Sequence, residues 1–253
     1  MSIKISREQL ISLTIDDFKS RYANTMFGYL WTIINPLFML ITLYIVFNYI
    51  INLGVPEYQL FLLIGIISWN YFSESTSASL QKIESSRDLL KKHKIEPMIL
   101  ILSSCLSSLI SLFVSTIIFL MILTYMGKPI VLLHMLSILY LFILFVISFG
   151  TSLLISSIYP HFKDIRHIWS FALLAGFWAT PVVYSETTLP SSYIRFYMLN
   201  PIARIISHLR NLFLHNYIDD LSQVLITVSL SLIILFATIW LYSYASKNMA
   251  EKL

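Results

Sequence analysis

The chain has 253 residues, of which 57% are apolar and only 12% are charged. Soluble domains carry about 25% charged residues, so this composition excludes a water-soluble protein and predicts an integral membrane protein. The apolar residues form long continuous runs rather than alternating segments of about ten residues, which excludes a membrane barrel and predicts membrane-spanning helices.

The first predicted element is an amphipathic helix at residues 3–21. Ile11, Ile15 and Phe18 follow one another at steps of four and three residues, so they share one face of a helix. A helix with such an apolar stripe, and with charged residues elsewhere, lies flat on a membrane surface. We therefore expect an N-terminal interfacial helix on the cytoplasmic leaflet.

Six further runs predict an all-α fold with six membrane-spanning helices in a single domain, residues 1–253. Most of the runs reach the roughly 20 residues that cross the hydrocarbon core, although the fifth is barely long enough. The predicted spans are residues 27–51, 59–79, 98–125, 131–158, 168–184 and 221–244. Pro36 removes a backbone donor inside the first span and should loosen or kink that helix.

Lysine and arginine are distributed unevenly over the loops between these spans. With the N-terminus in the cytoplasm, 13 of the 17 basic residues fall on the cytoplasmic side. Such a bias sets the orientation of membrane proteins, and it predicts a multi-pass protein of the cytoplasmic (inner) membrane with both termini in the cytoplasm. The net charge of +4 is explained by this topology and gives no reason to propose nucleic acid as a partner.

The polar segment 80–97 follows the second span on the cytoplasmic side. Asp88 precedes Lys92 by four residues, and Glu84 precedes Arg87 by three, which favours a short solvated helix. A charged run of this kind often serves only as a membrane anchor. Its length and mixed charge make docking to a cytoplasmic partner an equal alternative.

Serine recurs at every fourth position toward the cytoplasmic ends of the third and fourth predicted spans. The positions are Ser103, Ser107, Ser111 and Ser115 in the third span and Ser148, Ser152 and Ser156 in the fourth. Small residues let helix backbones approach closely, so we expect these two spans to pack through their serines. Lining of a polar channel is the alternative.

The external segment 185–217 is too apolar for a free loop, yet its apolar stretches are too short or too charged to span. We expect two half-inserted helices, residues 194–199 and 202–214, broken at Asn200-Pro201. Arg204 and Arg210 would then lie near the outer head groups. Each is expected to be a snorkelling anchor, with contact to a phosphate-bearing substrate as the alternative.

Motifs for catalysis, nucleotide binding and metal binding are not found in the chain. Its six glycines nowhere form the G-x-x-x-x-G-K-[ST] loop that holds ATP. The single cysteine, Cys105, excludes a disulfide and a cysteine metal site. Glu74 lies near the inner end of the second span, where a carboxylate either pairs near the membrane surface or belongs to a transport path. We expect no catalytic and no metal-binding residues.

Three motifs in this order resemble the membrane subunit of ABC polysaccharide exporters, the permeases that move O-antigen, capsule or teichoic-acid chains. They are R-Y-x(5)-G-x-x-W-x(4)-P at Arg21, Tyr22, Gly28, Trp31 and Pro36, T-P-V-x-Y at Thr180 to Tyr184, and N-P-x(8)-R at Asn200, Pro201 and Arg210. The resemblance covers nearly the whole chain. The chain departs from the family pattern at Ile95-Glu96-Pro97, at Ile101 and at Lys163-Asp164, all on the cytoplasmic side.

The resemblance implies a homodimer that encloses a channel and two copies of a separate cytoplasmic ABC ATPase. ATP and Mg would be bound by that ATPase, and no cofactor by this chain. The resemblance also implies that segment 80–97 couples to the ATPase, that the N-terminal helix shapes substrate access, and that segment 185–217 forms an external gate. The coupling residues would be Arg87, Asp88, Lys91, Lys92 and Glu96, and the gate residues Tyr184, Asn200, Pro201, Arg204 and Arg210.

The function expected is therefore that of the permease half of an ATP-driven exporter of a lipid-linked polysaccharide. Arg21 and Tyr22 are expected at the cytoplasmic rim, where a lipid-linked head group would enter. Sugar C–H faces pack on aromatic rings, so the channel candidates are Trp31, Trp69, Tyr71, Phe72, Phe177 and Trp178. For each ring alone, core packing or a place in an aromatic belt is the common alternative.

Two other functions remain open from the sequence. An ABC permease for a drug, haem or a small lipid would share the six spans and the ATPase docking. A membrane-embedded enzyme acting on lipid-linked sugars would need a charged catalytic cluster, which the sequence does not reveal.

Overall fold

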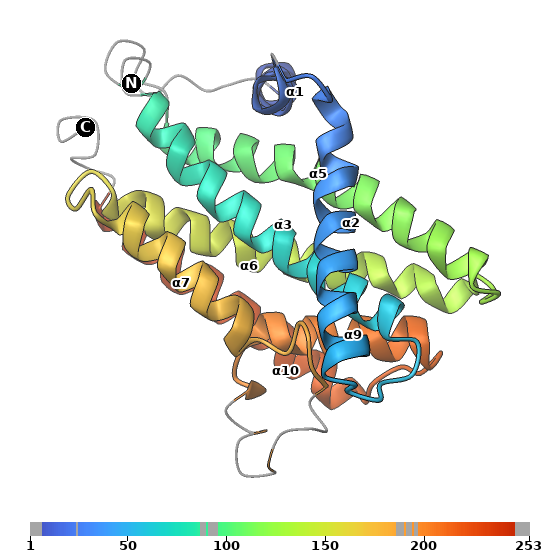
Figure 1. The fold of residues 1–253 in the computed structure, drawn as a ribbon. Helices are drawn as coiled ribbons and strands as arrows, with labels where there is room; N and C mark the ends of the chain where they lie inside the picture. Colours follow the sequence, from blue (N-terminus) through green and yellow to red (C-terminus); the bar gives the residue numbers. More distant parts are fainter. Residues whose placement is uncertain are drawn as a thin grey trace.

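The structure is a computed structural model that describes residues 7–23, 25–86, 90, 96–185, 190, 194 and 197–245. All regular secondary structure in these residues is helical (Figure 1). The α-helices are α1 Arg7–Tyr22, α2 Trp31–Tyr44, α3 Tyr58–Ser85, α5 Pro97–Tyr125, α6 Ser137–Ile158, α7 Ile165–Ala179, α9 Pro201–Leu214 and α10 Leu221–Ala245. Short 3-10 helices, Gly28–Leu30 and Leu132–Leu136, precede α2 and α6, and a π-helix, Ile45–Ile50, extends α2.

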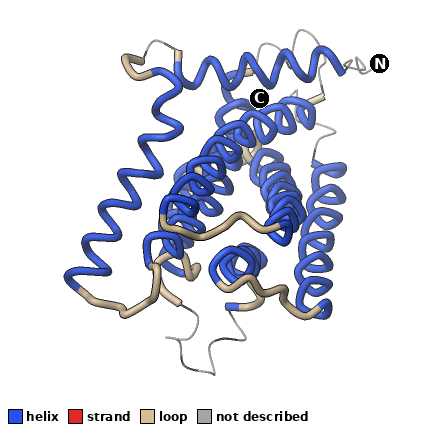
Figure 2. The backbone as a smooth tube through the Cα atoms, turned by 90° about the vertical axis from the view of Figure 1, so that its right-hand side faces the viewer, coloured by secondary structure: helices blue, strands red, loops and turns tan. Residues whose placement is uncertain are grey.

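Helix α1 lies crosswise over one end of the bundle and leads through a sharp turn into α2 (Figure 2). Gly28 in this turn has a φ of +50°, a left-handed conformation that glycine adopts without steric cost. Ile11 and Ile15 are exposed, while Leu13 packs on the core and Asp17 is buried. Two residues of the predicted apolar stripe are therefore free to contact lipid, whereas the third, Phe18, packs against Tyr22 and Tyr29. We call this side of the bundle the α1 end.

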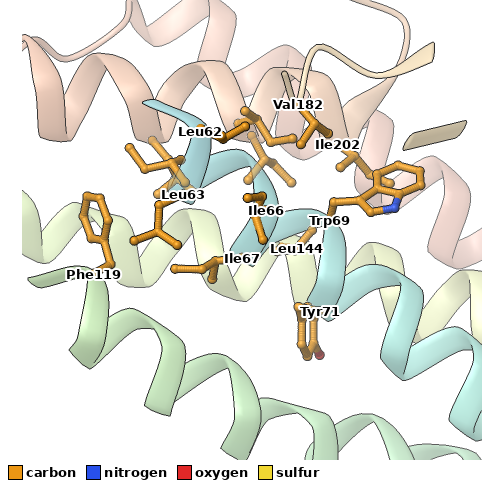
Figure 3. Packing of buried hydrophobic residues seen from close by; sticks show 14 of the residues in the cluster. Leu62, Leu63, Ile66, Ile67, Trp69, Tyr71, Phe119, Leu144, Val182 and Ile202 are labelled. Atoms are coloured by element: carbon orange, nitrogen blue, oxygen red, sulfur yellow. The ribbon is translucent and has the colours of Figure 1, made fainter. Parts of the chain in front are cut away.

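Helix α3 is the centre of the molecule. It packs against α2, α5, α6, α7 and α9, and 18 of its 28 residues are buried. Figure 3 shows Leu63, Ile66 and Trp69 of α3 spreading outward, with Leu144 of α6 and Val182 beside them. The largest hydrophobic cluster thus follows the N-terminal half of α3, between Tyr58 and Phe72.

Four segments are long and apolar enough to cross a membrane: Gly28–Ile50, Pro97–Tyr125, Leu132–Ile158 and Leu221–Tyr244. They correspond to the first, third, fourth and sixth predicted spans. Helix α3 has the length of a span but carries Asn70, Glu74 and Lys82. Helix α7 has only 15 residues, roughly 22 Å of helix against about 30 Å of hydrocarbon. The chain is a multi-helix membrane protein, and the six-span count remains a prediction.

The serines of α5 and α6 are buried, so neither serine face is turned outward. The two helices meet where the thiol of Cys105 donates to the Ser152 hydroxyl at 3.4 Å. Helix α3 joins the same contact, because Ser79 lies 3.4 Å from the Cys105 sulfur. The two helices therefore pack on each other through Cys105 and Ser152, and α3 is a third partner that the sequence did not indicate. Direct packing of the α5 serines on those of α6 remains a prediction.

Helix α9 lies crosswise inside the bundle at the end opposite α1, which we call the α9 end (Figures 1 and 2). Pro201 occupies its first turn, and the Asn200 side chain accepts a hydrogen bond from the Ile202 N–H at 3.0 Å. Both are strong helix-start signals. Ten of its 14 residues are buried. Of the preceding predicted helix, residues 194–199, the structure describes residues 194 and 197–199, and the Met198 N–H donates to the Ile194 carbonyl at 2.9 Å.

Candidate functional site

Four charged side chains meet at the α1 end, between α1, α3 and α5. Arg21 contacts Glu74 at 2.6 Å (Nη1 to Oε1) and Asp17 at 2.7 Å (Nη2 to Oδ2). Lys82 lies 3.0 Å from the other Asp17 oxygen. Two cations thus face two carboxylates, and we call this group the charge cluster.

Helix α5 completes the surroundings of Arg21. The guanidinium donates to the Ser108 hydroxyl at 2.8 Å and to the Ser104 carbonyl at 3.0 Å, while Ser111 donates to Glu74 at 3.2 Å. Burial alone would raise the pKa of Asp17, but Arg21 and Lys82 outweigh burial and hold the pKa of this carboxyl below its usual range. Asp17 is therefore ionised at neutral pH, and α1 is bound to the bundle by a neutralised set of charges.

A pocket of about 520 Å³ opens beside the charge cluster, between α2, α3 and α5. We call it the α2–α3–α5 pocket. Trp31, Thr32 and Asn35 line it from α2, Asn70, Ser73, Glu74 and Ser77 from α3, and Ser111 and Ser115 from α5. Arg21 and Tyr22 of α1 line it too. The two residues predicted at the point of substrate access therefore share one pocket, and burial raises the pKa of Tyr22, which keeps its hydroxyl protonated.

An aromatic cluster joins α1 to the turn before α2. The rings of Phe18 and Tyr29 are stacked with centroids 5.4 Å apart, and Tyr22 meets both edge-on. Phe27 packs edge-on against Trp31 at 5.6 Å. These contacts stabilise the crosswise position of α1 and place an aromatic rim next to the α2–α3–α5 pocket.

The six predicted channel aromatics fall in three places. Trp69, Phe72, Phe177 and Trp178 form a chain of ring contacts between α3 and α7, in which only Trp178 is exposed. Trp31 lines the pocket. Tyr71 points from α3 toward α5 (Figure 3), and its buried hydroxyl has no hydrogen-bond partner among the described residues. Their lining of a channel remains a prediction.

Sequence reasoning missed Trp169, which belongs to the chain of rings between α3 and α7. Its ring lies 6.1 Å from that of Phe72, and its indole nitrogen donates to the Thr76 hydroxyl at 3.1 Å. The spacing of eight residues from Trp169 to Phe177 places both on one helical face, and this was the signal available in the sequence.

Three predicted gate residues lie together at the α9 end. The Asn200 amide donates to the Thr180 hydroxyl at 3.0 Å, so the two proline-containing motifs contact each other. The Tyr184 hydroxyl donates to that of Tyr197 at 3.0 Å. Pro201 follows as the first residue of α9. These contacts connect the end of α7 to the start of α9.

Arg210 is buried, with 5% of its surface exposed, and its guanidinium binds backbone carbonyls. Nη1 donates to the Pro181 oxygen and Nη2 to the Val182 oxygen, each at 2.7 Å, and Nε donates to the Phe61 oxygen at 3.2 Å. The guanidinium also stacks on the Phe61 ring at 3.4 Å. The expected snorkelling of Arg210 is wrong, because the turn at residues 181–182 supplies inward-facing carbonyls that need donors.

Arg204 also turns inward and ties α9 to α10. It donates to the Thr227 hydroxyl at 2.9 Å and to the Gln223 side-chain oxygen at 2.6 Å, and 6% of it is exposed. The expectation of a snorkelling anchor is therefore wrong here as well. His208, one turn further along α9, lies 2.6 Å from Asp219 and 2.9 Å from Thr227. Sequence reasoning missed it, although its spacing of four from Arg204 marks one polar face on an apolar helix.

Gly65 of α3 allows the Arg210 contacts. A Cβ atom at this position would lie 2.7 Å from the Val182 oxygen and 3.0 Å from Arg210 Nη2. We expect Gly65→Ala to lower the free energy of unfolding by about 1 to 3 kcal/mol, because backbone must move to make room. Thermal unfolding of the detergent-purified protein measures this.

The control is Gly150→Ala in α6, where the nearest atom is a side-chain hydroxyl, that of Thr238, at 3.1 Å. A side chain can rotate away, so this variant should unfold near the wild-type temperature. Equal losses for the two glycines would contradict the role given to Gly65.

The predicted coupling residues are described only in part. Glu96 is exposed directly before α5, whereas Arg87, Asp88, Lys91 and Lys92 lie outside the described residues. Residues 80–85 continue α3 rather than forming a separate element. Glu84 accepts a hydrogen bond from Arg166 at 2.8 Å, which ties the end of α3 to the start of α7.

Comparison with known proteins places the chain in a class. The sequence model of the ABC-2 type transporter family matches residues 8–214. The chain therefore belongs to the ABC-2 type transporter family, whose members are transport subunits that work with a separate ATPase subunit.

Individual relatives are similar over most of their length. The O-antigen export system permease protein RfbA of Klebsiella pneumoniae is 28% identical over 218 residues, which cover 83% of this chain and 82% of the relative. The protein of the same name from Myxococcus xanthus is 25% identical, covering 98% and 96%. The polysialic acid transport protein KpsM of Escherichia coli is 22% identical, covering 97% and 96%.

Proposed function

We propose that the chain is the permease half of an ATP-driven exporter that moves a lipid-linked polysaccharide across the cytoplasmic membrane. The observation that carries the proposal is the similarity, over nearly the whole chain, to permeases named for O-antigen export and polysialic acid transport. The α2–α3–α5 pocket supports it, because a hydroxyl- and amide-lined cavity next to apolar membrane helices suits an amphiphilic substrate.

The proposed assembly is a homodimer of six-span subunits with two copies of an ABC ATPase beneath it. Large apolar side chains stand exposed on α2 and α7, among them Phe38, Phe171 and Trp178. Faces of this kind suit lipid or a second copy of the chain. The chain of rings between α3 and α7 would then contribute to the channel wall.

The ATPase is proposed to bind segment 80–97 at the α1 end, which would be the cytoplasmic side with both termini. The exposed Glu96 and the ion pair between Glu84 and Arg166 support this, because force on the segment would reach both α3 and α7. The α9 end would be external. Tyr184, Asn200 and Pro201 would act there as a gate, with Arg204 and Arg210 keeping α9 attached to the bundle.

Deleting this chain in its source cell tests the function. We expect the surface polysaccharide to disappear while its lipid-linked precursor accumulates inside, and plasmid-borne wild-type chain to restore it. We also expect the chain to co-purify with a soluble ABC ATPase in equal numbers. Undiminished surface polysaccharide would contradict the proposal.

The remaining alternative is an ABC permease for a drug, haem or a small lipid, which would share the ATPase partner. In that case the deletion would leave the surface polysaccharide unchanged and would alter the cell content of the small molecule.

A further inference from the structure

The lining of the α2–α3–α5 pocket includes a set of neutral polar side chains besides the charge cluster. Asn35 projects from α2, and Asn70, Ser73 and Ser77 project from α3. Amide and hydroxyl groups both donate and accept hydrogen bonds. A group rich in hydroxyls, which also does both, matches this set better than a group that only accepts.

The amides of this set have free hydrogen-bonding capacity. The side chains of Asn35 and Asn70 make no hydrogen bond to another residue in the described part of the chain, and both are at least partly exposed. Polar groups at membrane depth are costly unless they find partners, so two unpaired amides facing one cavity point to a ligand that pairs with them.

Charge argues against a phosphate in this pocket. Arg21 is the only cation among the described lining residues, and it is already bound to Glu74 and Asp17. Glu74 itself lines the cavity. A phosphate beside Arg21 would therefore be repelled by a carboxylate at short range, whereas a neutral group would not.

Trp31 of α2 adds an aromatic ring to the lining that Asn35 and Asn70 share. The ring is half-buried and is packed edge-on by Phe27. A flat aromatic face next to amides and hydroxyls is the combination that suits a sugar ring, which has apolar C–H faces and a polar edge. The volume of about 520 Å³ falls within the range of about 300 to 1,000 Å³ for small-molecule sites.

We propose that the α2–α3–α5 pocket binds a neutral sugar unit of the lipid-linked glycan, with Trp31 against the ring and Asn35 and Asn70 on its hydroxyls. The proposal rests on the proposed function and adds the substrate group that this site takes. Arg21 then acts as a structural partner of α1 rather than as a phosphate ligand. The same hydroxyl chemistry occurs in the head groups of bulk membrane lipids, so the test must separate the two sources.

Photo-crosslinking at Trp31 distinguishes a sugar of the glycan from a head group of the bulk lipids. The substitution Trp31→p-azidophenylalanine, in the complete transporter in cells, places a reactive ring in the pocket. The control is Trp240→p-azidophenylalanine, because Trp240 is 69% exposed on α10, outside the pocket. Cells carry either a radioactive sugar in the glycan or a radioactive fatty acid in the bulk lipids. We expect sugar label at position 31 and not at position 240.

Two outcomes would overturn the sugar site. One is fatty-acid label alone at position 31, and the other is no label at position 31 in cells that export normally. A result against the proposed function itself would be distinguishable from these two outcomes, because the polysaccharide would then reach the surface of cells that lack the chain.

Substitution of the two amides gives a second measurement. The double variant Asn35→Ala, Asn70→Ala should slow export by about 5- to 150-fold, since each lost hydrogen bond is worth about 0.5 to 1.5 kcal/mol. Its amount in the membrane and its binding to the ATPase should not change. The matched control Asn48→Ala alters a half-buried asparagine of the same span outside the pocket and should leave export near wild type. Equal export by both variants would contradict the proposal.

Discussion

Replacing Arg210 by methionine is expected to destabilise the protein by about 3 to 5 kcal/mol. The change removes the donor to the Pro181 and Val182 carbonyls, which face the interior, and a buried carbonyl left unpaired costs about 1 to 3 kcal/mol. It also removes the contact of the guanidinium with the Phe61 ring. Thermal unfolding and the yield of monodisperse protein in detergent measure the loss.

Arg210→Lys should rescue little, because an ammonium group cannot reproduce the planar fork that reaches several carbonyls at once. The control is Arg166→Met, which makes the same chemical change at an exposed residue paired with Glu84. Exposed ion pairs contribute about 0 to 1 kcal/mol, so this variant should be nearly as stable as the wild type. A loss at Arg210 no larger than at Arg166 would refute the role of Arg210.

The second large effect is expected in the charge cluster. Arg21→Met leaves Glu74 without its cation, and breaking a buried pair by removing one partner costs about 3 to 5 kcal/mol. The pair here is partly accessible, with 17% and 32% of the side chains exposed, so we expect about 2 to 3 kcal/mol after solvent screening. The observable result is easier proteolysis between α1 and α2, together with a lower unfolding temperature.

A double variant shows whether the loss in Arg21→Met comes from the unpaired charge of Glu74 or from the lost packing of the Arg21 side chain. Adding Glu74→Gln to Arg21→Met removes the unpaired charge, so the double variant should recover at least half of the loss. Losses that simply add would show that Arg21 and Glu74 act independently. Arg21→Lys keeps the positive charge but not the planar fork that reaches both carboxylates and α5, so we expect it to be less stable than the wild type and more stable than Arg21→Met.

Helix ends and apolar length could be predicted from the sequence. The Asn200-Pro201 pair predicted a helix start that the structure places at Pro201, because an asparagine cap and an N-terminal proline act locally. The four longest apolar spans were predicted for a similar reason, since the length and apolarity of a run are properties of the sequence itself.

Contacts between side chains that are distant in the sequence could not be predicted. Charged residues on α9 suggested the head-group region, yet Arg204 and Arg210 face carbonyls and hydroxyls of other helices that are distant in sequence. The same holds for the charge cluster, because Asp17 and Glu74 are 57 residues apart and meet only through the crosswise course of α1. The sequence singled out Arg21 and Tyr22, but it could not show the pocket that they line, because three other helices, α2, α3 and α5, form its walls.

Helices α3 and α10 differ in burial, and they should therefore differ in how many substitutions they tolerate. Most positions of α3 are enclosed on all sides by other helices, so both the size and the polarity of each side chain are restricted there. On α10 only a narrow seam is buried, which includes Thr227, Ser231, Thr238 and Tyr242. Replacement of its exposed apolar residues by other apolar ones should leave a functional chain, so a library of such changes would show α10 as more permissive than α3.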